Sequence, residues 1–119
     1  MGEIVCSKSK EVRQIYPKPG WIEQDPNELW LTQIQAARQV MEVANVKPSQ
    51  IAGIGVANQR ETTIVLERDT GRPIHNAIVW QCRRTADICN ELKRSKKNEE
   101  IRSRTGLFPD AYFSGTKIK

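Results

Sequence analysis

The 119-residue sequence predicts an α/β fold, in which helices pack against a sheet of short apolar strands. Three observations support this prediction. One long stretch has the apolar spacing of an amphipathic helix. Three short stretches are rich in the apolar and β-branched residues typical of strands. Finally, strand and helix patterns alternate along a chain whose length suits one domain or part of one.

The clearest element is a helix over residues 26–44. Asp25 is suited to cap its first turn, Pro26 fits the first helical position, and Glu28 stands where a capping-box partner belongs. Apolar residues then recur with helical spacing at Trp30, Ile34, Ala37, Met41 and Ala44. They define one face of the helix, so we expect Trp30 to lie in the core.

Strands are expected both before and after this helix in the sequence. An irregular strand region over residues 3–16 precedes it. The stretch 51–57 is apolar and contains glycine, as expected of a strand that is covered on both faces. Further strands are predicted at 62–67 and 77–80, with a turn over 69–73 between them.

The last third of the sequence predicts helices. One should run from about Thr85 to Arg94, and a shorter one over residues 98–104 should end at Gly106. Ser114 has the character of an N-cap for a helix that begins close to the last residue.

The composition excludes several classes of protein. Hydrophobic residues make up 38% and charged residues 28%, no apolar run is long enough to span a bilayer, and the first residues do not resemble a signal peptide. We therefore expect a cytoplasmic protein with no membrane insertion. Three cysteines, an odd number without a C-x-x-C spacing, predict free thiols, and the single His75 has no companion at metal-ligand spacing.

The net charge of +5 raises the possibility of a nucleic-acid-binding domain. The basic residues are scattered, however, apart from the run at residues 93–97. That run lies at the end of a predicted helix, where cations complement the helix dipole and remain solvated. We therefore expect no nucleic-acid partner.

Four stretches carry more specific information: residues 15–26 (IYPKPGWIEQDP), 57–63 (ANQRETT), 76–85 (NAIVWQCRRT) and 112–117 (YFSGTK). In this order and spacing they resemble the amino-terminal domain of the glycerol kinases, in the FGGY family of carbohydrate kinases. The likeness extends over the chain from about residue 3 onward.

The resemblance implies an actin-like (ribonuclease H-like) ATPase domain, present here as an incomplete mixed sheet with flanking helices. It implies ATP with Mg²⁺ as phosphoryl donor, glycerol as acceptor and sn-glycerol 3-phosphate as product, in a complete protein that is a homo-oligomer. It also implies site roles: Arg60 and Glu61 hold glycerol hydroxyls, Tyr112 is a further hydroxyl partner, and the ring of Trp80 packs against the carbon backbone.

The residue types suit this chemistry. A triol carries no charge, so its affinity depends on matched hydrogen bonds; a guanidinium offers only donors and a carboxylate only acceptors. Taken alone, an Arg-Glu pair after a strand is ordinarily a solvated loop pair, a tryptophan at a strand end is a core residue, and Tyr112 would anchor a loop. The agreement of all four stretches favours the binding roles.

The resemblance also predicts what residues 1–119 do not contain. The family's first two strands, with their phosphate-binding loop, its catalytic aspartate and its C-terminal nucleotide-binding domain match nothing in this sequence. Asp69 and Asp110 lack the surrounding motif and are not substitutes. We therefore expect a partial domain with no catalytic, cofactor-binding or metal-binding residue, which binds no ATP or Mg²⁺ and is inactive in isolation.

One alternative remains from a different class of protein. The same fold can serve as a non-catalytic module that binds glycerol or another protein. Such a module would keep the site residues without the phosphoryl-transfer chemistry.

Overall fold

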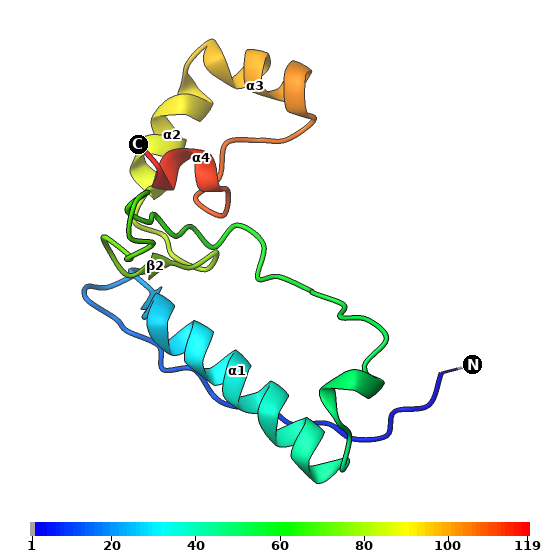
Figure 1. Cartoon of the computed structure of the whole chain (residues 1–119). Helices are drawn as coiled ribbons and strands as arrows, with labels where there is room; N and C mark the ends of the chain where they lie inside the picture. Colours follow the sequence, from blue (N-terminus) through cyan, green and yellow to red (C-terminus); the bar gives the residue numbers. More distant parts are fainter. Residues whose placement is uncertain (1) are drawn as a thin grey trace.

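The computed structural model describes residues 2–119, and Figure 1 shows how their elements are arranged. In chain order these elements are β1 (Glu23–Gln24), α1 (Pro26–Val43), the 3₁₀ helix η1 (Pro48–Gln50), β2 (Ala77–Ile78), α2 (Ala86–Arg94), α3 (Lys97–Thr105) and α4 (Ser114–Lys117). Helix α1 lies on one side of the small sheet, and α2, α3 and α4 gather on the other. The Cα radius of gyration is 18.8 Å, against about 13.5 Å for a compact domain of this length. The chain is therefore extended.

Helix α1 begins as its sequence predicts. The Asp25 carboxylate accepts a hydrogen bond from the Asn27 amide at 2.8 Å, and Pro26 is the first helical residue. The expected capping box is wrong, because Glu28 instead accepts the Arg13 amide at 3.1 Å and so ties the N-terminal segment to the helix. The core position of Trp30 is also wrong. Its side chain is 66% exposed, because nothing else in residues 2–119 covers that part of the helix.

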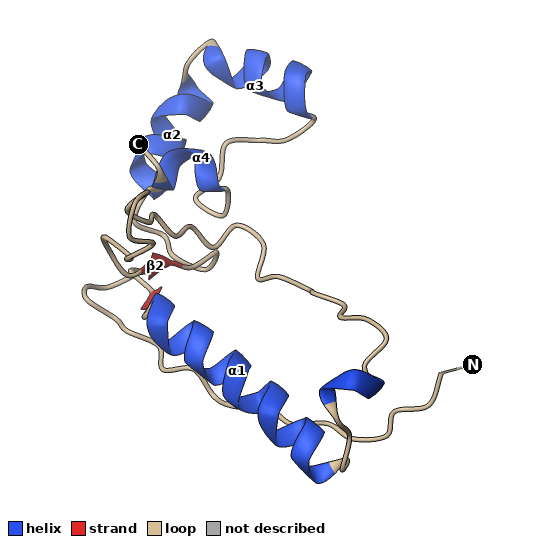
Figure 2. Ribbon diagram, viewed as in Figure 1, coloured by secondary structure: helices blue, strands red, loops and turns tan. Residues whose placement is uncertain are grey.

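The sheet is much smaller than predicted. Strands β1 and β2 pair antiparallel, with Glu23 opposite Ile78. Of the predicted strands, only 77–80 coincides with a strand of the structure; 62–67 and 3–16 contribute isolated bridges, and β1 was not predicted. The stretch 51–57 forms no strand; it is part of the long loop that follows η1, which Figure 2 draws in tan. A strand needs a neighbour to accept and donate its hydrogen bonds, and residues 2–119 place none beside this stretch.

The predicted helices near the C-terminus are confirmed. Helices α2 and α3 agree with the expected ranges within one residue, and α3 ends at Gly106, whose φ of +73° is the left-handed conformation that glycine adopts readily. A turn forms close to the predicted range 69–73 but begins earlier, because the Gly71 amide bonds the Glu67 carbonyl and the Glu67 amide bonds the Arg72 carbonyl. Ser114, however, is the first residue of α4 and not its cap; Phe113 is the cap.

The buried residues lie around β2 and the start of α2. The fully or almost fully buried apolar residues are Ala77, Val79, Cys82, Cys89 and Ala111. All three cysteines are free thiols, and Cys82 and Cys89 are buried. In residues 2–119 no helix has both the length and the apolar character needed to cross a membrane. The small core thus lies where the loops after β2 and before α4 meet.

Candidate functional site

Three loops meet at a shallow pocket of about 190 Å³. It is lined by Gln59 and Arg60 from the connection before residue 63, by Trp80 just after β2, and by Tyr112 from the loop before α4. Three of the four predicted site residues therefore share one hollow although they lie up to 52 positions apart in the sequence. Gln59 is an addition that sequence reasoning did not single out.

The aromatic wall of the pocket is an edge-to-face pair. The ring centroids of Trp80 and Tyr112 are 6.0 Å apart and their planes meet at 71°, which is a favourable geometry for two aromatic rings. Tyr112 makes a second such contact with Phe113, with centroids 5.1 Å apart. Val79, which is 1% exposed, anchors the chain just before Trp80. The tryptophan itself stays 40% exposed, so its ring remains available to a ligand.

The polar side of the pocket is Gln59 and Arg60. The side-chain oxygen of Gln59 accepts a hydrogen bond from the Thr62 hydroxyl. This bond leaves the Gln59 amide group as a donor, and the guanidinium of Arg60, which also lines the pocket, offers donors only. The polar edge is therefore rich in donors.

Glu61 does not line this pocket. Its backbone has a φ of +62°, a left-handed conformation that is uncommon for residues other than glycine. Its carboxylate oxygen Oε2 accepts hydrogen bonds from the Ser114 amide and from the Ser114 hydroxyl, both at 2.8 Å. These two bonds hold the pKa of Glu61 below its ordinary 4.5, with the amide contributing most, so the group is ionised at neutral pH.

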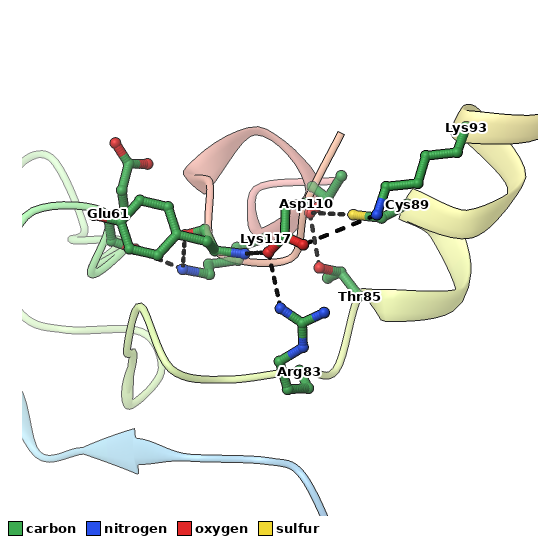
Figure 3. Close-up of polar contacts among 9 residues, drawn as sticks. Glu61, Arg83, Thr85, Cys89, Lys93, Asp110 and Lys117 are labelled. Atoms are coloured by element: carbon green, nitrogen blue, oxygen red, sulfur yellow. Dashed lines mark hydrogen bonds and ion pairs between the residues drawn. The ribbon is translucent and has the colours of Figure 1, made fainter. Parts of the chain in front are cut away.

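Lys117 joins the two loops that carry Glu61 and Tyr112. Its ammonium donates one hydrogen bond to each of their backbone carbonyls, both at 2.7 Å. The residue is only 9% exposed, and this burial lowers the pKa of its amine. Figure 3 shows Lys117 reaching the loop of Glu61 from the short helix α4. The sequence placed Lys117 in a characteristic stretch, but no local signal gave its role.

Asp110 fixes the loop of Tyr112 from its other side. Its carboxylate accepts the Tyr112 amide at 2.8 Å and the Arg83 guanidinium at 2.8 Å, while the Lys93 ammonium lies 4.0 Å away. Figure 3 shows Arg83 and Lys93 approaching Asp110 from different parts of the chain. The amide bond, followed by the Arg83 contact, keeps the pKa of Asp110 below its ordinary value despite partial burial.

A second charged cluster lies beside strands β1 and β2. The Glu23 carboxylate is 5% exposed and accepts a hydrogen bond from the Arg84 guanidinium, which is 10% exposed. It also accepts one from the side-chain amide of Asn76, at 2.8 Å. Arg84 also stacks on Trp21, 4.0 Å from the ring centroid. Burial raises the pKa of Glu23, but the bonds from Arg84 and Asn76 outweigh it, so the pKa is lowered overall.

The described residues supply no evident metal centre. Within residues 2–119, no three His, Cys, Asp or Glu side chains gather closely enough to hold an ion.

Comparison with known proteins identifies the class to which this fold and site belong. Residues 1–119 match the model of the N-terminal domain of the FGGY family of carbohydrate kinases, and the chain belongs to that family. Within the family, it is similar to glycerol kinases. It is 61% identical over 118 residues to glycerol kinase 2 of Thermotoga maritima and 59% identical over 118 residues to the glycerol kinase of Caldanaerobacter subterraneus subsp. tengcongensis.

Each of these alignments covers 99% of the chain but 24% of the relative, so the chain spans about a quarter of the length of the curated relatives that it matches. A crystal structure of Plasmodium falciparum glycerol kinase with ADP superposes with a TM-score of 0.83 at 35% identity, over 92% of this chain and 22% of that one. The predicted family and fold class are thereby confirmed.

Proposed function

We propose that this chain forms part of the glycerol-binding side of an ATP-dependent glycerol kinase that produces sn-glycerol 3-phosphate. The observation that carries the proposal is the convergence of Arg60, Trp80 and Tyr112 on one small pocket. The identity of 59–61% to glycerol kinases supports glycerol as the acceptor. The match to glycerol kinase solved with ADP supports ATP as the donor, with Mg²⁺ as its companion ion.

The residues around the pocket suit an uncharged triol. Arg60 donates hydrogen bonds to hydroxyl oxygens, and the Tyr112 phenol either donates or accepts one. The exposed face of Trp80 covers the C–H side of the ligand and keeps water from it. Together these groups recognise hydroxyls on one side and carbon on the other, as a short polyol requires.

Glu61 lies next to Arg60 in the sequence without lining the pocket, and we propose that it supplies the acceptor that glycerol needs. A glycerol hydroxyl must also donate its proton, and an ionised carboxylate is the strongest acceptor among side chains. Ser114 occupies Oε2 of Glu61, so Oε1 is the atom that we assign to glycerol. Its lowered pKa keeps this acceptor ionised through the neutral range.

The reaction itself is a phosphoryl transfer from ATP to a terminal hydroxyl of glycerol. Phosphoryl transfer depends mainly on positioning and on charge stabilisation, so the contribution of these residues is to hold the hydroxyl in place. We further propose that the protein acts in the cytoplasm and assembles as a homo-oligomer. No step of the nucleotide chemistry is assigned to residues 2–119.

The test is a measurement of ADP release by the protein at its natural length with glycerol, and with propane-1,2-diol and propane-1,3-diol, which lack one hydroxyl each. We expect ADP release to require glycerol, and kcat/KM to fall by up to about 10⁴-fold for a diol, because buried polar groups then lose their partner. Equal rates with all three alcohols, or none with glycerol, would contradict the proposal.

Substitutions assign the effect to the pocket. Arg60→Lys should lower kcat/KM for glycerol by at least about tenfold, because an ammonium cannot reproduce the planar fork of donors. Glu61→Gln should lower it more, since the amide replaces an ionised acceptor. Arg38→Lys on α1, where the side chain is exposed, is the matched control and should leave kcat/KM unchanged.

A further inference from the structure

The short helix α4 contacts both loops of the proposed glycerol site. Its first residue, Ser114, gives two hydrogen bonds to one carboxylate oxygen of Glu61. Its last residue, Lys117, gives one hydrogen bond to the backbone carbonyl of Glu61 and one to that of Tyr112. One turn of helix therefore holds Glu61 by both its side chain and its backbone, and joins it to Tyr112.

Lys117 makes this connection at an energetic cost. A buried ammonium loses its hydration, and the loss is tolerated only when protein groups replace the water. Here two carbonyl oxygens do so at 2.7 Å, and both belong to residues that we assign to glycerol. Burial lowers the pKa of the amine, while Cys82 and then the carboxylate of Glu61 act in the opposite direction. The two loops that it connects therefore supply the hydrogen-bond acceptors that replace water around the amine.

The backbone of Glu61 also requires support. A left-handed conformation is unfavourable for a residue with a Cβ, and such strain persists only where the surroundings fix it. The bonds from Ser114 and Lys117 provide these constraints. Without them, the peptide at Glu61 would relax and the carboxylate would turn away from its present direction.

We propose that Ser114 and Lys117 are positioning residues for the glycerol site: Lys117 sets the separation of the Glu61 and Tyr112 loops, and Ser114 sets the direction of the Glu61 carboxylate. This inference rests on the proposed function. Neither residue lines the pocket. Both act through residues that we assign to glycerol, so their loss affects the glycerol side of the reaction and leaves the nucleotide side unchanged.

The test is steady-state kinetics on the natural-length protein with Ser114→Ala, Ser114→Thr and Lys117→Met. A displacement of about 1 Å in a positioned group costs on the order of 10²-fold. We therefore expect kcat/KM for glycerol to fall by roughly 10- to 100-fold in Ser114→Ala and Lys117→Met, with KM for ATP unchanged. Ser114→Thr retains a hydroxyl and should restore most of the loss.

A pH profile separates positioning from a general effect on folding. The bonds from Ser114 lower the pKa of Glu61. Removing the hydroxyl takes away one of these two bonds, while the backbone amide of residue 114, the larger contributor, remains. The pKa should therefore rise part of the way toward its ordinary value, and the acid limb of kcat/KM for glycerol should move by a small amount to higher pH in Ser114→Ala. A change in the amount of folded protein alone would scale the profile without moving the limb.

Two exposed residues provide matched controls. Ser103 in α3 donates its hydroxyl to the backbone carbonyl of Glu100 and not to a carboxylate, and Lys96 is exposed just before α3. Ser103→Ala and Lys96→Met should behave as wild type. If Ser114→Ala matches Ser103→Ala in KM for glycerol and in its acid limb, the inference is overturned even if Lys117→Met fails to fold. A wild-type protein without glycerol-dependent ADP release would instead overturn the proposed function.

Discussion

The two ends of the molecule are held together in different ways. Around the pocket, hydrogen bonds and ion pairs join residues that are 27 to 61 positions apart in the sequence. In the segments 2–10 and 51–57, apolar side chains such as Ile4, Val5, Ile54 and Val56 are 80–89% exposed. The pocket end is thus ordered by polar contacts, whereas the most apolar stretches of the chain remain uncovered.

This difference shows that apolar character alone does not place a segment in a core. Strand formation requires a second strand at about 4.8 Å, and burial requires a surface of matching shape. Polar side chains need only one partner at the right distance, so Glu23, Glu61 and Asp110 can each fix a loop. The comparison leads to three predictions, ordered by the size of the expected effect.

The largest effect is expected from Arg84→Met. Its guanidinium is the main partner of the buried Glu23 carboxylate, and breaking a buried pair on one side costs about 3–5 kcal/mol because the other charge stays unpaired. Urea denaturation measures the free energy of unfolding. The matched control is Arg104→Met, which removes an exposed pair with Glu100 and should cost less than about 0.5 kcal/mol. Equal losses in both variants would show that Glu23 is not effectively buried.

A smaller effect should appear on acidification. Because the pKa of Glu23 is lower in the folded protein than its ordinary 4.5, its contribution to stability is fully present above pH 4.5. That contribution is lost as the pH falls from 4.5 through the folded pKa, where the carboxyl group becomes protonated. Unfolding midpoints measured from pH 6 to pH 3 should therefore fall, and less steeply in a Glu23→Gln variant. Parallel curves for the two proteins would argue against this origin.

The smallest effect concerns the uncovered end. In the 119-residue chain, amide hydrogens of residues 52–57 should exchange at nearly the rate of an unstructured peptide, since no backbone hydrogen bond within residues 2–119 protects them. The amides of Thr63 and Ile78, which bond each other's carbonyls at 2.9 Å, should exchange more slowly. Hydrogen-exchange mass spectrometry compares the two. Strong protection at 52–57 would mean that another strand covers this stretch in solution.

The sequence predicted the helices better than the sheet because helix signals are local. Asp25 with Pro26 marks the start of α1, and Gly106 marks the end of α3, each within a few residues of the element that it bounds. A strand depends on a distant partner. The pattern at 51–57 is that of a strand, but in residues 2–119 it has no neighbour. The core position predicted for Trp30 was wrong for the same reason. Helical spacing predicts which residues share one face of a helix, but not which other segment covers that face.

The candidate site shows the same limit. Arg60, Trp80 and Tyr112 were selected through a resemblance to a family, and the structure brings them to one pocket. The contacts of Ser114 and Lys117 with Glu61 span 53 and 56 residues, so no local pattern predicts them. The hydroxyl of Ser114, interpreted as a helix cap, bonds Glu61 instead. The binding roles of the four predicted residues remain predictions, which the kinetic experiments above test.

The left-handed backbone at position 61 sets two selective pressures against each other. Glycine is the residue that adopts this conformation without steric cost, so Glu61→Gly should relieve strain while removing the carboxylate. In a library of variants sorted only for abundance in the cell, glycine at position 61 should be enriched. In the same library sorted for growth on glycerol as sole carbon source, it should be depleted. A glutamate that persists there would thus be one that selection keeps for its chemistry, against the preference of the fold.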